Sequence, residues 1–247
     1  MENLLRPRTV PAGDRLVVVA TEALPEAAAR LIATGIELAI SQRGCATVAL
    51  AGGTTPRMVY RRLAQVHRLP WERIEIYFGD ERAVSPDDPQ SNYRMARELL
   101  FDAVPIPSSH IHRMPAERPD REAAANEYGA ELPHRLDLII LGIGEDGHTA
   151  SLFPGSYALD EEVRKVVAVA GPKPPTHRLT VTPPVITAAA TKIVLASGSG
   201  KAKAVAEALE GSLNFAGCPA QLARDGIWIM DHAAAAVLRE NQGPRIR

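Results

Sequence analysis

Short aliphatic runs alternate with longer amphipathic segments along most of this chain, and this alternation restricts the fold more than any other feature. The strand predicted at Asp137–Leu141, for example, contains four consecutive aliphatic residues. Strands of this kind are buried on both faces, which is typical of parallel sheets enclosed between helices. The pattern therefore predicts an α/β protein whose mostly parallel sheet carries helices on both faces.

The order of the predicted elements follows the same alternation. Strands are expected at residues 16–20, 46–51, 74–78, 137–141, 165–170, 178–181, 192–196 and 227–230, with a short one at 111–114. Helices are expected at residues 22–42, 57–66, 91–102, 120–132, 201–210 and 233–240. The strand at 137–141 is expected at the centre of the sheet, and the strand at 227–230 is expected to close it. Residues 79–90 are expected to form a long polar loop.

Length and composition favour one domain without a membrane or nucleic-acid partner. The chain has 247 residues, of which 46% are hydrophobic, and no linker divides it, so a single domain over residues 1–247 is predicted. The net charge is −1 with no basic stripe, which argues against nucleic acid. No apolar run approaches the roughly 20 residues of a membrane span, and the first residues do not resemble a secretory signal. A soluble cytoplasmic protein is therefore expected.

The two cysteines, Cys45 and Cys218, are too few for a disulfide framework or a cysteine metal site. Cys45 opens an apolar run and is expected to be a small core residue.

Three polar loops follow predicted strands, at residues 52–56, 79–92 and 142–155. In an open parallel sheet, ligands bind beyond the carboxyl ends of the strands. These loops are therefore expected to meet at one site although they lie far apart in the sequence.

The first loop, Gly52-Gly-Thr-Thr-Pro56, has the residues of a phosphate-binding turn. Gly52 and Gly53 let the backbone approach a ligand, and Thr54 and Thr55 add hydroxyl donors. Pro56 suits the first turn of a helix, whose free amides attract anions. An ordinary strand–helix turn with a threonine cap uses the same residues, so this loop alone leaves both interpretations open.

The second loop begins with Gly79-Asp-Glu-Arg82, a cluster of charges at a strand end. Arg82 can bind a phosphate or carboxylate through two parallel hydrogen bonds, and Asp80 can bind sugar hydroxyls or orient a base. Ser91 is most simply a helix N-cap, whereas Asn92 is a candidate for ligand contact. A solvated charged loop is the alternative interpretation.

The third loop contains Gly142-x-Gly144-x-x-Gly147, the spacing of a dinucleotide fingerprint. A fingerprint of this kind needs a helix immediately after it, and Pro154-Gly155 cuts the following segment short. A nicotinamide cofactor is therefore not expected.

A catalytic interpretation explains the same loop better. Gly147 permits a left-handed backbone that presents His148 outward, and an imidazole can take a proton from water near neutral pH. Asp146 can orient that ring or bind a sugar hydroxyl. A capping or core histidine is the alternative, and the neighbouring polar loops favour catalysis.

Three further sequence patterns do not support a nucleotide site, a metal site or an α/β-hydrolase. Ser197-Gly-Ser-Gly-Lys201 lacks the first glycine and the final Ser/Thr of a nucleotide-binding P-loop, although Lys201 can still bind a phosphate at the start of a helix. His110-x-His112 has no acidic or cysteine neighbour in sequence to complete a metal site, so no metal is expected. No Gly-x-Ser-x-Gly elbow is present, which argues against an α/β-hydrolase.

Four segments together resemble the glucosamine-6-phosphate isomerase/6-phosphogluconolactonase superfamily, and within it the 6-phosphogluconolactonases. They are LAGGTTPRMVY, IYFGDERAVSPDDPQSNYRMARELL, DLIILGIGEDGHTASLFPGS and HRLTVTPPVITAAATKIVLASGSGKAKAV. The resemblance implies a Rossmann-like, NagB/RpiA/CoA-transferase-like fold. It is most specific in the second and third segments, and it extends over nearly the whole chain.

Departures from the deaminase branch favour the lactonase branch. Deaminases carry a tyrosine where Arg82 stands, and a glutamate soon after the histidine where this chain has Ser151-Leu-Phe-Pro-Gly155. Ala51 and Thr54 replace serines frequent in lactonases, but Thr54 keeps the hydroxyl.

The resemblance implies hydrolysis of 6-phospho-D-glucono-1,5-lactone to 6-phosphogluconate, in the oxidative pentose phosphate pathway, without metal or nucleotide cofactor. The hypothesis is direct attack of water on the lactone, with His148 as general base and Asp146 as its neighbour. Glycine-loop amides or Arg82 are candidates for stabilising the oxyanion, and Gly144 is expected to contact the substrate. The expected phosphate ligands are the 52–55 loop, Arg178 and Lys201, and Asp80 is expected to contact sugar hydroxyls.

An amino-sugar phosphate deaminase, a non-catalytic sugar-phosphate sensor and a nicotinamide oxidoreductase are the competing interpretations. A monomer or a small homo-oligomer is expected.

Overall fold

A six-stranded parallel sheet forms the centre of the structure, a computed structural model that describes residues 15–65 and 69–239. Its strands lie in the order β1-β9-β8-β5-β2-β3, and every pairing within it is parallel. The strands are β1 (Leu16–Val19), β2 (Ala46–Leu50), β3 (Ile74–Phe78), β5 (Leu138–Gly142), β8 (Thr191–Ala196) and β9 (Ile227–Asp231). The predicted α/β class with a mostly parallel sheet is confirmed.

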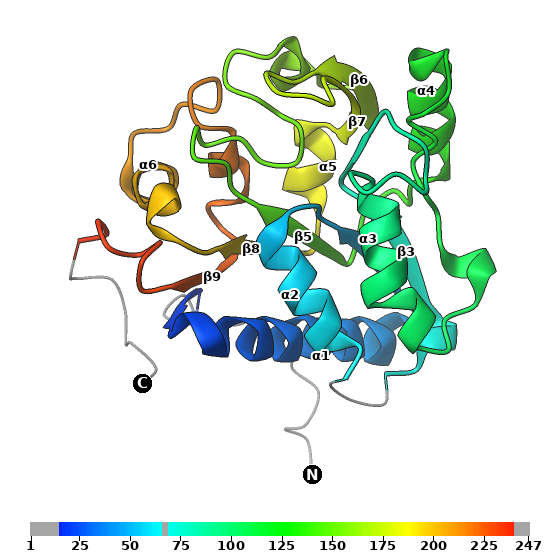
Figure 1. Cartoon of the computed structure of the whole chain (residues 1–247), viewed down its shortest axis with the longest axis horizontal. Helices are drawn as coiled ribbons and strands as arrows, with labels where there is room; N and C mark the ends of the chain where they lie inside the picture. Colours follow the sequence, from blue (N-terminus) through cyan, green and yellow to red (C-terminus); the bar gives the residue numbers. More distant parts are fainter. Residues whose placement is uncertain (1–14, 66–68, 240–247) are drawn as a thin grey trace.

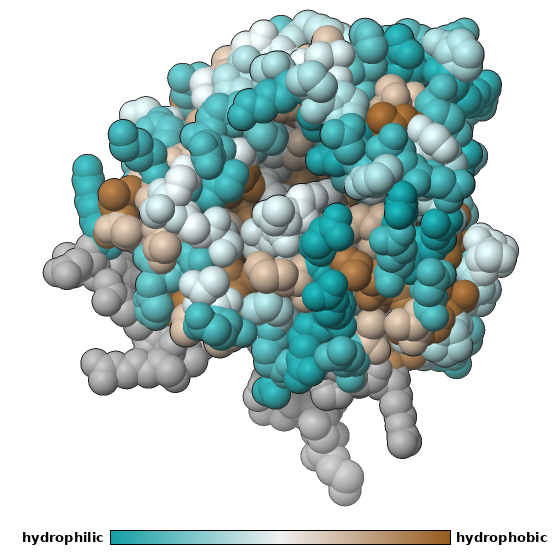
Figure 2. All heavy atoms as spheres, viewed as in Figure 1, coloured by the Kyte–Doolittle hydropathy of each residue, from teal (hydrophilic) through white to brown (hydrophobic). Residues whose placement is uncertain are grey.

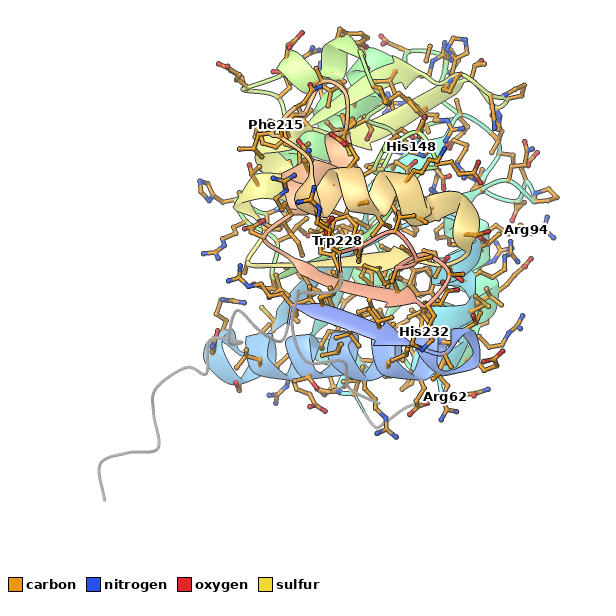
Figure 3. All side chains as sticks on the ribbon, turned by 90° about the vertical axis from the view of Figure 1, so that its left-hand side faces the viewer. Arg62, Arg94, His148, Phe215, Trp228 and His232 are labelled. Carbon is orange, nitrogen blue, oxygen red and sulfur yellow. The ribbon has the colours of Figure 1, made fainter. Side chains whose placement is uncertain are left out.

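Helices cover both faces of this sheet (Figures 1 and 3). The α-helices are α1 (Leu24–Arg43), α2 (Thr54–Leu63), α3 (Asn92–Leu99), α4 (Arg121–Glu131), α5 (Pro183–Ala188) and α6 (Ala202–Glu210). In Figure 3, α1 lies below the strands and α6 above them. None of the helices in the described part of the chain is long and apolar enough to cross a membrane.

The long helix α1 shows how local sequence sets these elements. A proline stands in its first turn, and Gly44 ends it with a φ of 83°, a left-handed conformation that suits glycine. Its buried residues recur at helical spacing and face the sheet: Leu24, Ala28, Ala29, Ile32, Ala33, Ile36 and Ala39. The many alanines let the helix axis lie close to the strands.

A second, antiparallel sheet was not anticipated. It has the order β4-β7-β6 and consists of β4 (Asp80–Arg82), β7 (His177–Val181) and β6 (Val166–Ala170). The strands predicted at 165–170 and 178–181 therefore exist but do not join the main sheet. The loop predicted at 79–90 begins with a strand, because Asp80–Arg82 pair with Arg178–Thr180.

Several other expectations were wrong in detail. Ile111 forms one isolated bridge to Ile76 instead of opening a strand. Residues 232–238 form turns and a bend where a helix was predicted at 233–240; residue 240 lies outside the described residues. The Asp231 carboxylate accepts the Ala234 N–H as a helix N-cap would, but in the described part of this segment only Ala235 and Leu238 continue with backbone hydrogen bonds, to Asp231 and Ala235, so no helix propagates. Cys45 is exposed in the turn between Gly44 and β2. Strand β9 lies between β1 and β8 and does not close the sheet.

A buried carboxylate at the end of β9 joins three of the strand ends. Asp231 accepts hydrogen bonds from the hydroxyls of Thr21 and Ser197 and from the N–H groups of Gly198 and Ala234. Burial opposes ionisation, but these donors prevail and hold the pKa of Asp231 below its ordinary value. The charge therefore stabilises the loop that follows β8.

Asp231→Asn should lower the free energy of unfolding by about 1–3 kcal/mol at pH 7, because the amide group faces donors that need an acceptor. The folded-state pKa is depressed, so this contribution is complete above the unfolded-state pKa of about 3.9 and is lost as pH falls through the folded-state pKa. Urea unfolding from pH 7 to pH 3 measures this, with Asp102→Asn on the exposed surface as the control. A stability difference that does not shrink towards acid pH would contradict the assignment.

Candidate active site

The three polar loops meet in one cleft at the carboxyl edge of the main sheet. The cleft encloses about 690 Å³, including the part open to solvent, within the range of small-molecule sites. Figure 2 shows the surface hollowed near the middle of the face that Figure 1 presents. The residues of the lining that carry polar or charged groups are Thr54, Thr55, Asp80, Arg82, His148, Arg178, Ser197 and Lys201.

His148 is held by Asp146 at the rim of this cleft. The ring Nδ1 lies 2.5 Å from Asp146 Oδ1, and the same oxygen accepts the His148 N–H at 3.2 Å. Burial opposes ionisation of Asp146, but the His148 backbone N–H and ring together keep the pKa of that carboxyl below its ordinary value. With Nδ1 bound to the carboxylate, Nε2 forms no hydrogen bond to the residues that the structure describes. Figure 3 shows His148 towards the arrowhead side of the strands.

Two glycines make this pair possible. A Cβ on Gly144 would lie 2.0 Å from His148 Nδ1 and 2.3 Å from Asp146 Oδ1, so only glycine leaves room for both groups. Gly147 has a φ of 85°, as the sequence predicts, and a Cβ there would lie 3.0 Å from Cys218 Sγ. The glycines thus shape the turn around His148.

No helix follows this turn directly. The next regular element after β5 is the short 3₁₀ segment Tyr157–Asp160. The dinucleotide fingerprint therefore lacks the helix N-terminus that would bind a pyrophosphate.

Asp80 lines the cleft as a buried and well-anchored carboxylate. The Ser151 hydroxyl donates to its Oδ2 at 2.6 Å, and Asn92 Nδ2 lies 3.1 Å from its Oδ1. Asn92 also donates to the Asp80 carbonyl at 2.8 Å and lies behind Asp80, outside the lining. A Cβ on Gly52 would lie 2.0 Å from Asn92 Oδ1, so Gly52 makes room for Asn92.

Glu81 supports the site from outside the cleft, and no role was predicted for it from the sequence. Strand alternation directs it away from the cleft, and its carboxylate accepts the N–H groups of Asn92 and Tyr93 and the hydroxyl of Ser91. Burial raises the pKa of Glu81, and the backbone donors oppose that shift. A negative charge at the start of α3 is favourable, and it ties the helix to β4. The predicted Ser91 N-cap is present, since its hydroxyl accepts the Arg94 N–H.

Three cations converge on the cleft without acidic partners. Arg82, Arg178 and Lys201 form no ion pair within 4.0 Å among the residues that the structure describes. The buried Nε of Arg82 has no hydrogen-bond partner there, although its Nη1 donates to the Gln90 carbonyl. Burial lowers the pKa of Arg178. The arrangement is suited to an anionic ligand.

Ser197 also lines the cleft, although the sequence assigned it no role beyond its place in a motif that fails as a P-loop. Its position directly after β8 was the available signal, since the other lining loops also follow strands. Its hydroxyl donates to Asp231, which fixes the loop leading to Lys201.

The paired histidines lie elsewhere, against the outer strand β3. The expectation that no acid accompanies them was wrong, because Glu75 lies 2.8 Å from His112 Nε2 and 3.6 Å from His110 Nε2. Within residues 15–65 and 69–239, however, no three His, Cys, Asp or Glu side chains are grouped to hold a metal ion.

The fold and the cleft define a class: an α/β protein with a cationic small-molecule site at the carboxyl edge of a parallel sheet. The family model for glucosamine-6-phosphate isomerases/6-phosphogluconolactonase matches residues 20–229, and the chain belongs to this family.

Its relatives include several 6-phosphogluconolactonases. The enzyme of that name from Synechocystis sp. is 39% identical over 236 residues, covering 90% of this chain and 97% of that protein. The one from Streptomyces coelicolor is 37% identical, and the match covers 90% of this chain and 94% of that protein. The structure of 6-phosphogluconolactonase from Trypanosoma brucei superposes with a TM-score of 0.80 at 32% identity, covering 91% and 98%. A monomeric glucosamine-6-phosphate deaminase also reaches 0.80, at 26% identity, covering 90% and 99%.

Gly144→Ala should separate Asp146 from His148, because the added methyl group would occupy the space between them. Gly142→Ala is the matched control, since a Cβ there meets nothing within 4 Å. The imidazole resonances of His148 in NMR spectra should move in the first variant and stay in the second. Unchanged resonances in Gly144→Ala would show that the pair does not depend on this glycine.

Proposed function

We propose that this protein hydrolyses 6-phospho-D-glucono-1,5-lactone to 6-phospho-D-gluconate, the lactonase step of the oxidative pentose phosphate pathway. The observation that carries the proposal is the cleft itself, in which a histidine–carboxylate pair faces three cations that have no acidic partner among the described residues. The relatives named 6-phosphogluconolactonase, which match most of this chain, support it.

In the proposed reaction, His148 acts as general base on a water molecule. Because Nδ1 is bound to Asp146, Nε2 can take the proton. The water oxygen attacks C1 of the lactone and forms a tetrahedral oxyanion. The ring oxygen then leaves and receives the proton from His148, so no acyl-enzyme forms. Asp146 keeps the ring oriented and stabilises its charged form.

The charge that develops on the carbonyl oxygen needs donors nearby. Arg82 is one candidate, since its buried Nε has no hydrogen-bond partner among the described residues. The backbone amides of the loop around Gly144 are the other candidates. Arg82 and Gly144 line the cleft together with His148.

The phosphate is assigned to the cations and the start of α2. Gly53, Thr54 and Thr55 line the cleft at the N-terminus of this helix, where free amides favour an anion. Lys201 and Arg178 supply positive charge. Asp80 accepts hydrogen bonds from sugar hydroxyls, and Asn92 holds Asp80 in place from behind.

A deaminase has the same fold, so residues must distinguish the two reactions. Arg82 lines the cleft, and the segment Ser151–Gly155 contains no acid. Release of ammonia from glucosamine 6-phosphate would favour the deaminase.

His148→Asn should lower kcat by about 10²–10⁴-fold and leave KM nearly unchanged, because the base is lost but the phosphate ligands remain. The assay measures formation of 6-phosphogluconate from freshly generated lactone above the spontaneous background. His134→Asn, exposed at the amino end of β5, is the control and should behave as wild type. Near-normal turnover of His148→Asn would overturn the assignment of the base.

Lys201→Met should raise KM by roughly 10-fold or more and change kcat less, since a charge-assisted hydrogen bond to phosphate contributes about 1.5–3 kcal/mol. Lys203→Met, exposed two residues further along on α6, is the matched control. Equal KM values for the two variants would remove Lys201 from the phosphate site.

A further inference from the structure

We infer that Phe153 is a positioning residue that holds His148 and Arg178 in one fixed arrangement; this inference rests on the proposed function. The Phe153 and His148 ring centroids lie 4.8 Å apart with the planes tilted by 47°. The guanidinium carbon of Arg178 lies 5.5 Å from the Phe153 centroid, over the ring. One aromatic side chain thus contacts both the proposed base and a proposed phosphate ligand.

The segment that carries Phe153 is anchored on both sides. Before it, Ser151 donates to Asp80, and Leu152 is fully buried. After it, Ser156 donates its N–H to the Phe153 carbonyl, and Gly155 donates to Ala216. These contacts leave the ring little freedom to move, which a positioning group requires.

Gly171 leaves space for the ring and for Arg178 together. A Cβ at this position would lie 3.0 Å from the Phe153 ring and 3.1 Å from Arg178 Nε. Phe153 is only 8% exposed and is absent from the lining of the cleft, so it acts on substrate through its neighbours.

The ring also has an electrostatic role. In the proposed reaction His148 becomes positively charged, and Arg178 is a second positive charge close by. The negative face of an aromatic ring attracts a cation, with about 0.5–2 kcal/mol for each contact. Both groups lie within 6 Å of the Phe153 ring centre, so the ring stabilises each positive charge, where a leucine would only fill volume.

Phe153→Leu should therefore lower kcat about 10-fold through His148 and raise KM several-fold through Arg178. Phe101→Leu is the matched control, because Phe101 is 7% exposed and lies in the aromatic cluster of Phe78 and Tyr93. Phe101→Leu should lower the unfolding temperature about as much as Phe153→Leu does, but its kcat and KM should stay near the wild-type values.

A double-mutant cycle with Arg178→Met separates positioning from general destabilisation. Arg178→Met should raise KM by a smaller factor in Phe153→Leu than in the wild-type protein, and by the full factor in Phe101→Leu. The ring-current shift of the His148 ring protons in NMR spectra should be lost in Phe153→Leu. If Phe153→Leu does not fold, Phe153→Met is tested in the same way.

The outcomes distinguish this inference from the function on which it rests. A wild-type protein without lactonase activity would overturn both. The inference alone would be overturned by a different result in an active wild-type protein. In that case Phe153→Leu would have the same kcat and KM as Phe101→Leu, and the effects of Phe153→Leu and Arg178→Met on KM would be additive. A non-additive cycle together with the altered His148 resonances would establish it.

Discussion

All strands of the main sheet run in the same direction, and the rest of the structure depends on this constraint. It places the ends of β2, β3, β5, β8 and β9 along one edge, so residues separated by over a hundred positions can line one cleft. The small antiparallel sheet adds Arg178 to that cleft by pairing with the continuation of β3. The chain can therefore assemble a charged site on loops while the aliphatic strands beneath it remain buried.

The fold class and the meeting of the three loops follow from short-range patterns, namely continuous aliphatic runs and the glycines after them. The local pairing of Asp146 with His148 follows from the same short-range pattern. The anchoring of Glu81 and the positioning role inferred for Phe153 depend on contacts with other segments, α3 and β7, which no local sequence pattern records. The helix expected near residue 233 is absent although the alanine run favours it and Asp231 caps its first turn, because the described backbone hydrogen bonds after Ala235 do not continue in the helical pattern.

The likeness to both lactonases and a deaminase shows how little of this architecture is tied to one reaction. The fold is shared by proteins named for both reactions. Under the proposed function, the chemical difference rests on a few side chains, such as Arg82 and the acid-free segment after His148. Work on specificity in this family can therefore concentrate on the two loops that carry them.

Gly52 and Asn92 have a consequence for such work. The amide of Asn92 fills the volume that a side chain at position 52 would need, and the same amide supports Asp80. Positions 52 and 92 are thus one packing unit split between two loops. A library that varies either loop alone will recover little beyond the starting residues at these positions, whereas paired variation gives access to new shapes of the cleft.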